Sequence, residues 1–150
     1  GYMEKFSRFA RIAETEFSDF VISTQDLGHK LRIYTIDKSF IDFYFTTELI
    51  ITRFSIHWER SHVDGTVVRI DNTPDIKWQK ISTYPVHFHE GKYERVKIPP
   101  FEIKNKSLEN ILREFLRYAR KLKFTDLKLD KYSRDFSDKE IKKWKREDKL

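Results

Sequence analysis

The stretch from residue 53 to residue 71 decides the fold, and it reads RFSIHWERSHVDGTVVRID. Apolar and polar residues alternate on both sides of Asp64-Gly65. Alternation with a period of two is typical of β-strands that bury one face. Asp-Gly often forms the turn of a hairpin, because both residues tolerate a left-handed backbone. We therefore predict a β-hairpin with strands over residues 53–60 and 66–71.

The apolar residues also set the register of this hairpin. Directly opposed residues of two antiparallel strands point to the same face of the sheet. The apolar faces coincide when Trp58 opposes Val68 and Ile56 opposes Ile70. The loop that this register leaves is centred on Val63, which agrees with a turn at the neighbouring Asp-Gly pair.

The same register defines a polar face. It places His57 opposite Arg69 and Ser55 opposite Asp71, on the side turned away from the core. The segment 84–90 reads YPVHFHE, and an extended chain there places His87 and His89 together on the face opposite to its apolar residues.

Histidine, arginine and aspartate side chains on one polar face are suited to the cleavage of RNA. Histidine gives and takes protons near neutral pH, and arginine binds phosphate. We predict that one histidine activates the 2′-hydroxyl and another protonates the leaving oxygen, without a metal. We expect five catalytic side chains to meet in one pocket: His57, Arg69, Asp71, His87 and His89.

Two other interpretations of the histidines remain open. His87 and His89, two positions apart on a strand, could bind one divalent metal together with Asp71 or Glu90. They could equally belong to a structural polar network. No cofactor-binding motif is present in the sequence.

The flanking segments predict the remaining elements. Residues 4–17 have a helical apolar spacing, and residues 20–22 begin an extended stretch. Residues 31–36 and 40–46 predict a further hairpin around Asp37-Lys38. Residues 108–122 predict the longest helix, whose apolar stripe requires an apolar partner, and Ser107 is in position to cap it.

These elements together predict an α+β fold. We expect a mainly antiparallel sheet of four to six strands, packed by an N-terminal helix and a long C-terminal helix. One domain should span residues 1–125, and a basic helical tail should follow over 126–150. A capping box at residues 137–140 indicates the start of the last helix in that tail.

The basic residues are concentrated late in the chain. Of 150 residues with a net charge of +6, those from Lys104 onward include 16 Lys or Arg against 9 Asp or Glu. A localised basic segment indicates nucleic-acid binding, although it can also be a solvated helix face. The candidate contacts are Arg113, Arg117, Arg120, Lys121, Lys142, Lys143, Lys145 and Arg146.

Composition excludes several classes of protein. The chain has no cysteine, so disulfides, cysteine zinc sites and thiol nucleophiles are excluded. No apolar run approaches the roughly 18 residues of a membrane span, so we expect no membrane association. With no secretory signal pattern either, we expect a cytoplasmic protein.

Four ordered blocks of sequence resemble the TumE-type toxin family of prokaryotic toxin–antitoxin modules. They cover residues 37–42, 54–60, 69–74 and 84–91. The resemblance implies a small α+β toxin and a cognate helix-turn-helix antitoxin that neutralises it. One departure is Asp75, where the family often has a histidine.

RNA cleavage is our inference from the residues and is not implied by the resemblance. Two alternatives stay open. One is a non-catalytic module that binds nucleic acid or protein through its basic C-terminal helices. The other is a toxin that sequesters a protein target.

Overall fold

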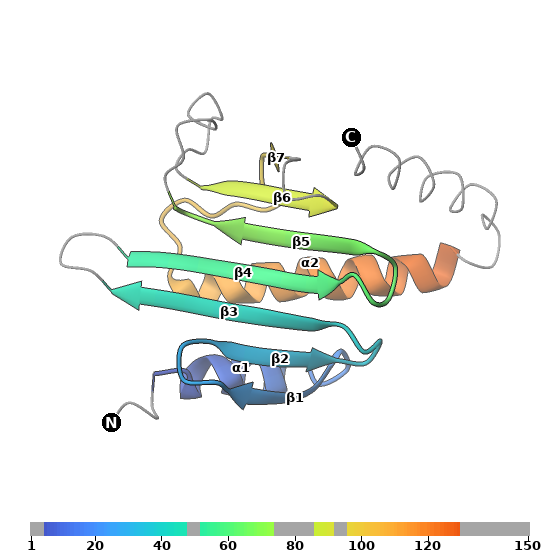
Figure 1. Cartoon of the computed structure of the whole chain (residues 1–150), viewed down its shortest axis with the longest axis horizontal. Coiled ribbons are helices and arrows are strands. Elements are labelled where there is room, and N and C mark those ends of the chain that lie inside the picture. The colour runs from blue at the N-terminus through green and yellow to red at the C-terminus, as the bar shows by residue number, and fades with distance from the viewer. Residues whose placement is uncertain (1–4, 48–51, 74–85, 92–95, 130–150) are drawn as a thin grey trace.

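The structure is a computed structural model that describes residues 5–47, 52–73, 86–91 and 96–129. These residues form two helices and one seven-stranded sheet (Figure 1). The elements in chain order are α1 (Ser7–Glu16), β1 (Val21–Asp26), β2 (Leu31–Thr35), β3 (Phe40–Thr47), β4 (Thr52–Arg60), β5 (Thr66–Asp71), β6 (His87–Gly91), β7 (Val96–Lys97) and α2 (Leu108–Leu129).

The sheet is an antiparallel meander. Its spatial order is the sequence order, and every neighbouring pair of strands is antiparallel. This confirms the predicted α+β class with one helix before the sheet and one after it. The strand number differs from the expected four to six, because β7 has only two residues and so shows no alternation in the sequence.

The register of the central hairpin is the predicted one. Ile56 pairs with Ile70 and Trp58 with Val68 across β4 and β5. Gly65 in the connecting turn has φ of +80°, a left-handed value that glycine adopts without steric cost. The alternation of apolar residues alone was therefore sufficient to align the two strands.

Both helices cover the same face of the sheet, and the opposite face carries no helix among the described elements (Figure 1). The apolar stripe of α2 is buried in one core cluster with the apolar residues of β4 and β5, among others. Ser107 caps α2, since its Oγ accepts a hydrogen bond of 3.2 Å from the backbone N–H of Asn110.

The helix α2 extends beyond the predicted end at residue 122, to Leu129. The apolar stripe ends earlier than the backbone helix, which is why the prediction was too short. The expected domain boundary at residue 125 falls within α2, and the expected helix from Ser137 lies outside the described residues.

A buried ion pair closes one end of the sheet. The Asp37 carboxylate accepts hydrogen bonds from Arg60 Nη1 (2.7 Å), Ser39 Oγ (2.6 Å) and Thr35 Oγ1 (2.8 Å). Burial of the carboxyl opposes its ionisation, but these hydrogen bonds prevail and hold the pKa of Asp37 well below its ordinary value. Lys38, with φ of +71°, completes the turn between β2 and β3.

The low pKa of Asp37 predicts a loss of stability in acid. A carboxyl group whose pKa is lower in the folded than in the unfolded chain stabilises the fold above its unfolded pKa of about 3.9. That contribution is lost as the pH falls through the folded value. Urea unfolding at pH 7, 5, 4 and 3 should show a shallower decline between pH 5 and 3 for Asp37→Asn than for the wild type. Equal declines would contradict this role.

Candidate active site on the open face of the sheet

A row of polar side chains crosses the open face of the sheet, the face without helices. Cross-strand pairing aligns Arg32 with Asp42, Asp42 with His57, His57 with Arg69, and Arg69 with His89. The predicted opposition of His57 and Arg69 is therefore confirmed. His57 and His89 are two strand spacings apart, about 10 Å between Cα atoms, with Arg69 between them.

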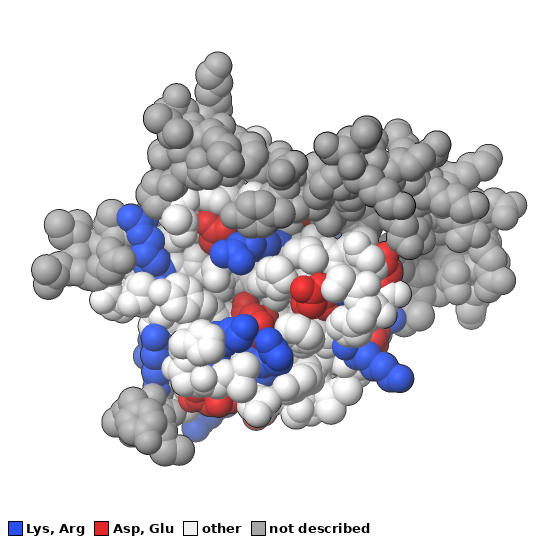
Figure 2. Space-filling view, in the orientation of Figure 1, with Lys and Arg blue, Asp and Glu red and all other residues white. Residues whose placement is uncertain are grey.

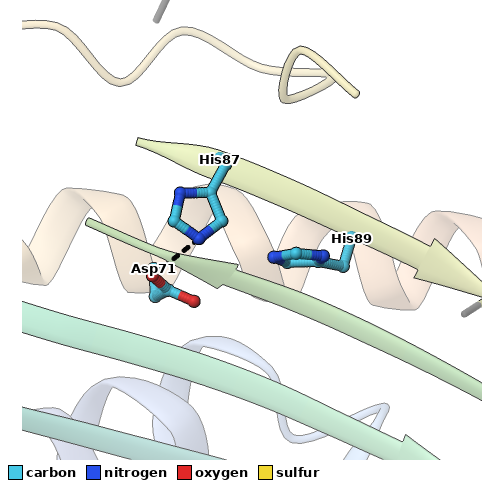
Figure 3. A group of neighbouring side chains, drawn as sticks. All are labelled: Asp71, His87 and His89. Carbon is cyan, nitrogen blue, oxygen red and sulfur yellow. Dashed lines mark ion pairs between the residues drawn. The ribbon is translucent and has the colours of Figure 1, made fainter. Parts of the chain in front are cut away.

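The neighbouring row is centred on Asp71, which pairs with Ser55 on one side and His87 on the other. His87 Nε2 lies 3.0 Å from Asp71 Oδ1 (Figure 3). Arg69 Nε donates to Asp71 Oδ2 at 3.0 Å. Burial opposes ionisation, but the hydrogen bonds from His87 and Arg69 lower the pKa of Asp71 to about 2. Asp71 is therefore a carboxylate that holds Arg69 in place.

Exposure divides the five predicted residues into two groups. Asp71, His87 and His89 are 2%, 3% and 0% exposed. The side chains of His57 and Arg69 are 28% and 29% exposed. The β6 histidines point away from the apolar core, but they are buried. The five residues therefore form two adjoining groups, one buried and one partly exposed, rather than one open pocket. Of these five residues, only His57 and Arg69 are accessible to a polymer substrate.

Glu59 is a further accessible group that the sequence analysis did not select. The Nε2–H of His57 donates to Glu59 Oε1 at 3.3 Å, and the backbone N–H of Ser61 donates to Oε2 at 3.0 Å. Burial opposes ionisation, but the hydrogen bonds from Ser61 and His57 lower the pKa of Glu59 below its ordinary value. The signal was available, since Glu59 follows His57 by two positions and so shares its face.

The accessible residues line a concave region of about 370 Å³. Figure 2 shows this face of the molecule, where basic and acidic side chains intermix. Asp42 is neutralised within it by two hydrogen bonds from Arg32, of 2.8 and 2.9 Å, and by Lys30 Nζ at 2.9 Å. The lining residues are Lys30, Arg32, Phe40, Asp42, Tyr44, Ser55, His57, Glu59 and Arg69.

A comparison with protein-family models finds one that matches residues 3–123, described as Toxin TumE. The chain belongs to the TumE toxin family. It is therefore the toxin of a toxin–antitoxin module, and its family implies a cognate antitoxin as partner. No curated protein and no solved structure matches the chain.

Within this TumE-family fold, Asn72 positions the end of β5. Its Oδ1 accepts a hydrogen bond from the backbone N–H of Phe54 at 2.8 Å, and its Nδ2 donates to the carbonyl of Thr52 at 2.7 Å. The amide thereby continues the pairing of β4 and β5 past the last regular strand residue. Asn72 follows Asp71 directly, so these bonds also fix the backbone that carries the Asp71 carboxylate.

Three of the four predicted nucleic-acid contacts on α2 of this TumE-family toxin are engaged in ion pairs. Arg113 binds Glu16 through Nε at 3.0 Å and Nη2 at 3.0 Å. The other two pairs join Arg117 to Glu114 at 2.8 Å and Arg120 to Asp19 at 3.5 Å. Lys121 is exposed, while Lys142, Lys143, Lys145 and Arg146 lie outside the described residues.

No helix in the described part of the chain is both long and apolar enough to cross a membrane.

Proposed function

We propose that this TumE-family toxin cleaves RNA in the cytoplasm by acid–base catalysis, with Glu59, His57 and Arg69 as its catalytic residues. One observation carries the proposal: Glu59 and His57 are in contact, 3.3 Å apart, in a concave region where Arg69 is the cross-strand neighbour of His57. A base, an acid and a phosphate-binding group are the three functions that cleavage of an RNA phosphodiester requires.

The roles follow from charge. Glu59 is a carboxylate at neutral pH, as glutamates ordinarily are, and the hydrogen bonds that lower its pKa do not change this, so it can accept the proton of the RNA 2′-hydroxyl. The 2′-oxygen then attacks the adjacent phosphorus, and the bond from phosphorus to the 5′-oxygen breaks. Protonated His57 gives its proton to that leaving oxygen. The products are a 2′,3′-cyclic phosphate and a 5′-hydroxyl end.

Arg69 stabilises the charge that builds up on the phosphate during this reaction. Its contact with Asp71 uses Nε, so both terminal nitrogens can still donate to phosphate oxygens. Asp71 and the buried His87 are positioning residues in this proposal, because they orient Arg69 without reaching the substrate. This differs from the expectation that two histidines would act as base and acid, and the burial of His87 and His89 is the reason.

Aromatic side chains at the same place suit a single-stranded RNA. Tyr44 is 37% exposed and Phe40 lines the same concave region. Unpaired bases stack on such rings, at about 1–3 kcal/mol per base. Phe43 and Phe45, by contrast, are buried in the core, as their alternation along β3 predicts.

The proposal predicts the chemistry of the products. Incubation of the purified chain with a single-stranded RNA oligonucleotide should give fragments with 2′,3′-cyclic phosphate and 5′-hydroxyl ends, identified by mass spectrometry. A matched oligonucleotide of 2′-deoxynucleotides should stay intact, because it lacks the attacking hydroxyl. Cleavage of both, or 5′-phosphate ends, would contradict the mechanism. No cleavage of either would favour a binding function or a protein target.

A further inference from the structure

The buried group beside the proposed active site has the composition of a metal site. Asp71 of β5 and His87 and His89 of β6 offer one carboxylate oxygen and two imidazole nitrogens. One ligand atom from each residue can be chosen so that all three lie within 4.8 Å of one another. Figure 3 shows the three side chains gathered on one side of the two strands.

The strand pairing produces this arrangement. Asp71 pairs directly with His87, and His89 follows on the same face two residues later, with 4.9 Å between the two ring centroids. Tetrahedral coordination with bonds of about 2.1 Å requires ligand atoms about 3.4 Å apart. His87 Nε2 and Asp71 Oδ1 are already 3.0 Å apart, so His89 is the side chain that has to adjust most.

We propose that Asp71, His87 and His89 bind one Zn²⁺ ion. Nitrogen ligands favour zinc over magnesium or calcium, which prefer oxygen alone. The set of two histidines and one carboxylate leaves a fourth position for water. Asp71 Oδ1 binds the ion, and both imidazoles are neutral when they bind it.

The groups around Asp71 suit this role. Arg69 Nε donates to Asp71 Oδ2 at 3.0 Å, and the backbone N–H of Thr73 donates to Oδ1 at 3.0 Å. Ligating carboxylates in proteins are typically hydrogen-bonded in this way, and such partners fix their orientation. When the ion binds, a bond from His87 to the ion and a bond from Asp71 to the ion replace the direct contact between these two side chains. The ion then links the side chains of β5 and β6 next to Arg69.

The proposal does not depend on RNA cleavage, because its three metal ligands are buried and a polymer substrate does not reach them. Its test is therefore a binding measurement. The full chain is treated with a chelator, desalted and titrated with Zn²⁺ in competition with a chromophoric indicator. We expect one Zn²⁺ per chain and a higher melting temperature with zinc. Cobalt in place of zinc should give the visible absorption bands of a four-coordinate ion.

Variants locate the ion. His87→Ala and His89→Ala should each weaken zinc binding by more than the roughly 10–100-fold that loss of a hydrogen-bonding partner of a ligand costs, because each removes a ligand itself. His29→Ala is the matched control, since His29 is exposed and distant in sequence, and it should bind zinc as the wild type does. Circular dichroism checks that each variant is folded. His57→Ala should also keep the ion, which separates this site from the proposed catalytic one.

Two results would overturn the proposal. One is a wild-type chain whose melting temperature and indicator signal do not respond to zinc. The other is stoichiometric binding that survives in both ligand variants or is lost in His29→Ala. The wild-type titration and the cobalt spectrum need no variant, so they decide the question even where a substitution prevents folding.

Discussion

Replacing His57 with alanine is expected to lower the rate of RNA cleavage by about 10²–10⁴-fold, the usual contribution of a general acid or base. The fold should survive, because the side chain is 28% exposed and its contact with Glu59 is a half-exposed one of 3.3 Å. The measurement is the initial rate of cleavage of a single-stranded RNA oligonucleotide, with the melting temperature recorded for each variant.

Two further variants test whether the loss of activity is specific to the proposed catalytic residues. Glu59→Gln keeps the size of the side chain and removes its basicity, so it should lose activity on the same scale as His57→Ala. His29→Ala removes an exposed histidine outside the concave region and should cleave at the wild-type rate. Activity of His57→Ala within about threefold of the wild type would reject His57 as a catalytic residue, since a general acid contributes far more.

Replacing Arg60 with alanine is expected to destabilise the protein by about 3–5 kcal/mol, the range observed when one partner of a buried ion pair is removed. The Arg60 side chain is 8% exposed and bridges Asp37, at 2.7 Å, and Asp64, at 2.9 Å. Its guanidinium also lies over the Trp58 ring, 4.6 Å from the centroid. Truncation leaves the Asp37 carboxylate buried, and among the described residues its remaining cationic neighbour is Lys123, at 3.7 Å.

A surface ion pair is the matched control for this prediction. Arg8 pairs with Glu109, but its side chain is 64% exposed, so Arg8→Ala should cost less than about 1 kcal/mol. The free energy of unfolding is measured for both variants by urea denaturation at pH 7. A loss in Arg60→Ala no larger than that in Arg8→Ala would show that the network around Asp37 does not stabilise the fold.

Much of the sheet could be predicted because its residues alternate. The pairs of Ile56 with Ile70 and Trp58 with Val68 follow from a period of two on each side of a recognisable turn. A shift by one residue would expose every apolar side chain of the hairpin. The two-residue β7 shows the limit of this reasoning, because a strand of that length has no period.

The candidate site was predicted in part. The alternation of apolar and polar residues along β4 and β5 placed His57 opposite Arg69. The same alternation placed both β6 histidines on the open face. Alternation shows on which face of the sheet a side chain lies, but it does not show how exposed that side chain is. The burial of His87 and His89 depends on tertiary packing, which the alternation along a single strand does not show.

The sequence by itself determined that both helices form, where the strands long enough to alternate lie, which face of each is apolar, and how β4 and β5 align. These properties depend on residues a few positions apart, where the backbone geometry is fixed. Only the tertiary structure decided the pairing of Arg60 with Asp37, 23 positions away, and of Arg113 with Glu16, 97 positions away. It also decided the burial of Asp71, His87 and His89, because burial and long-range charge pairing arise only when distant segments pack together.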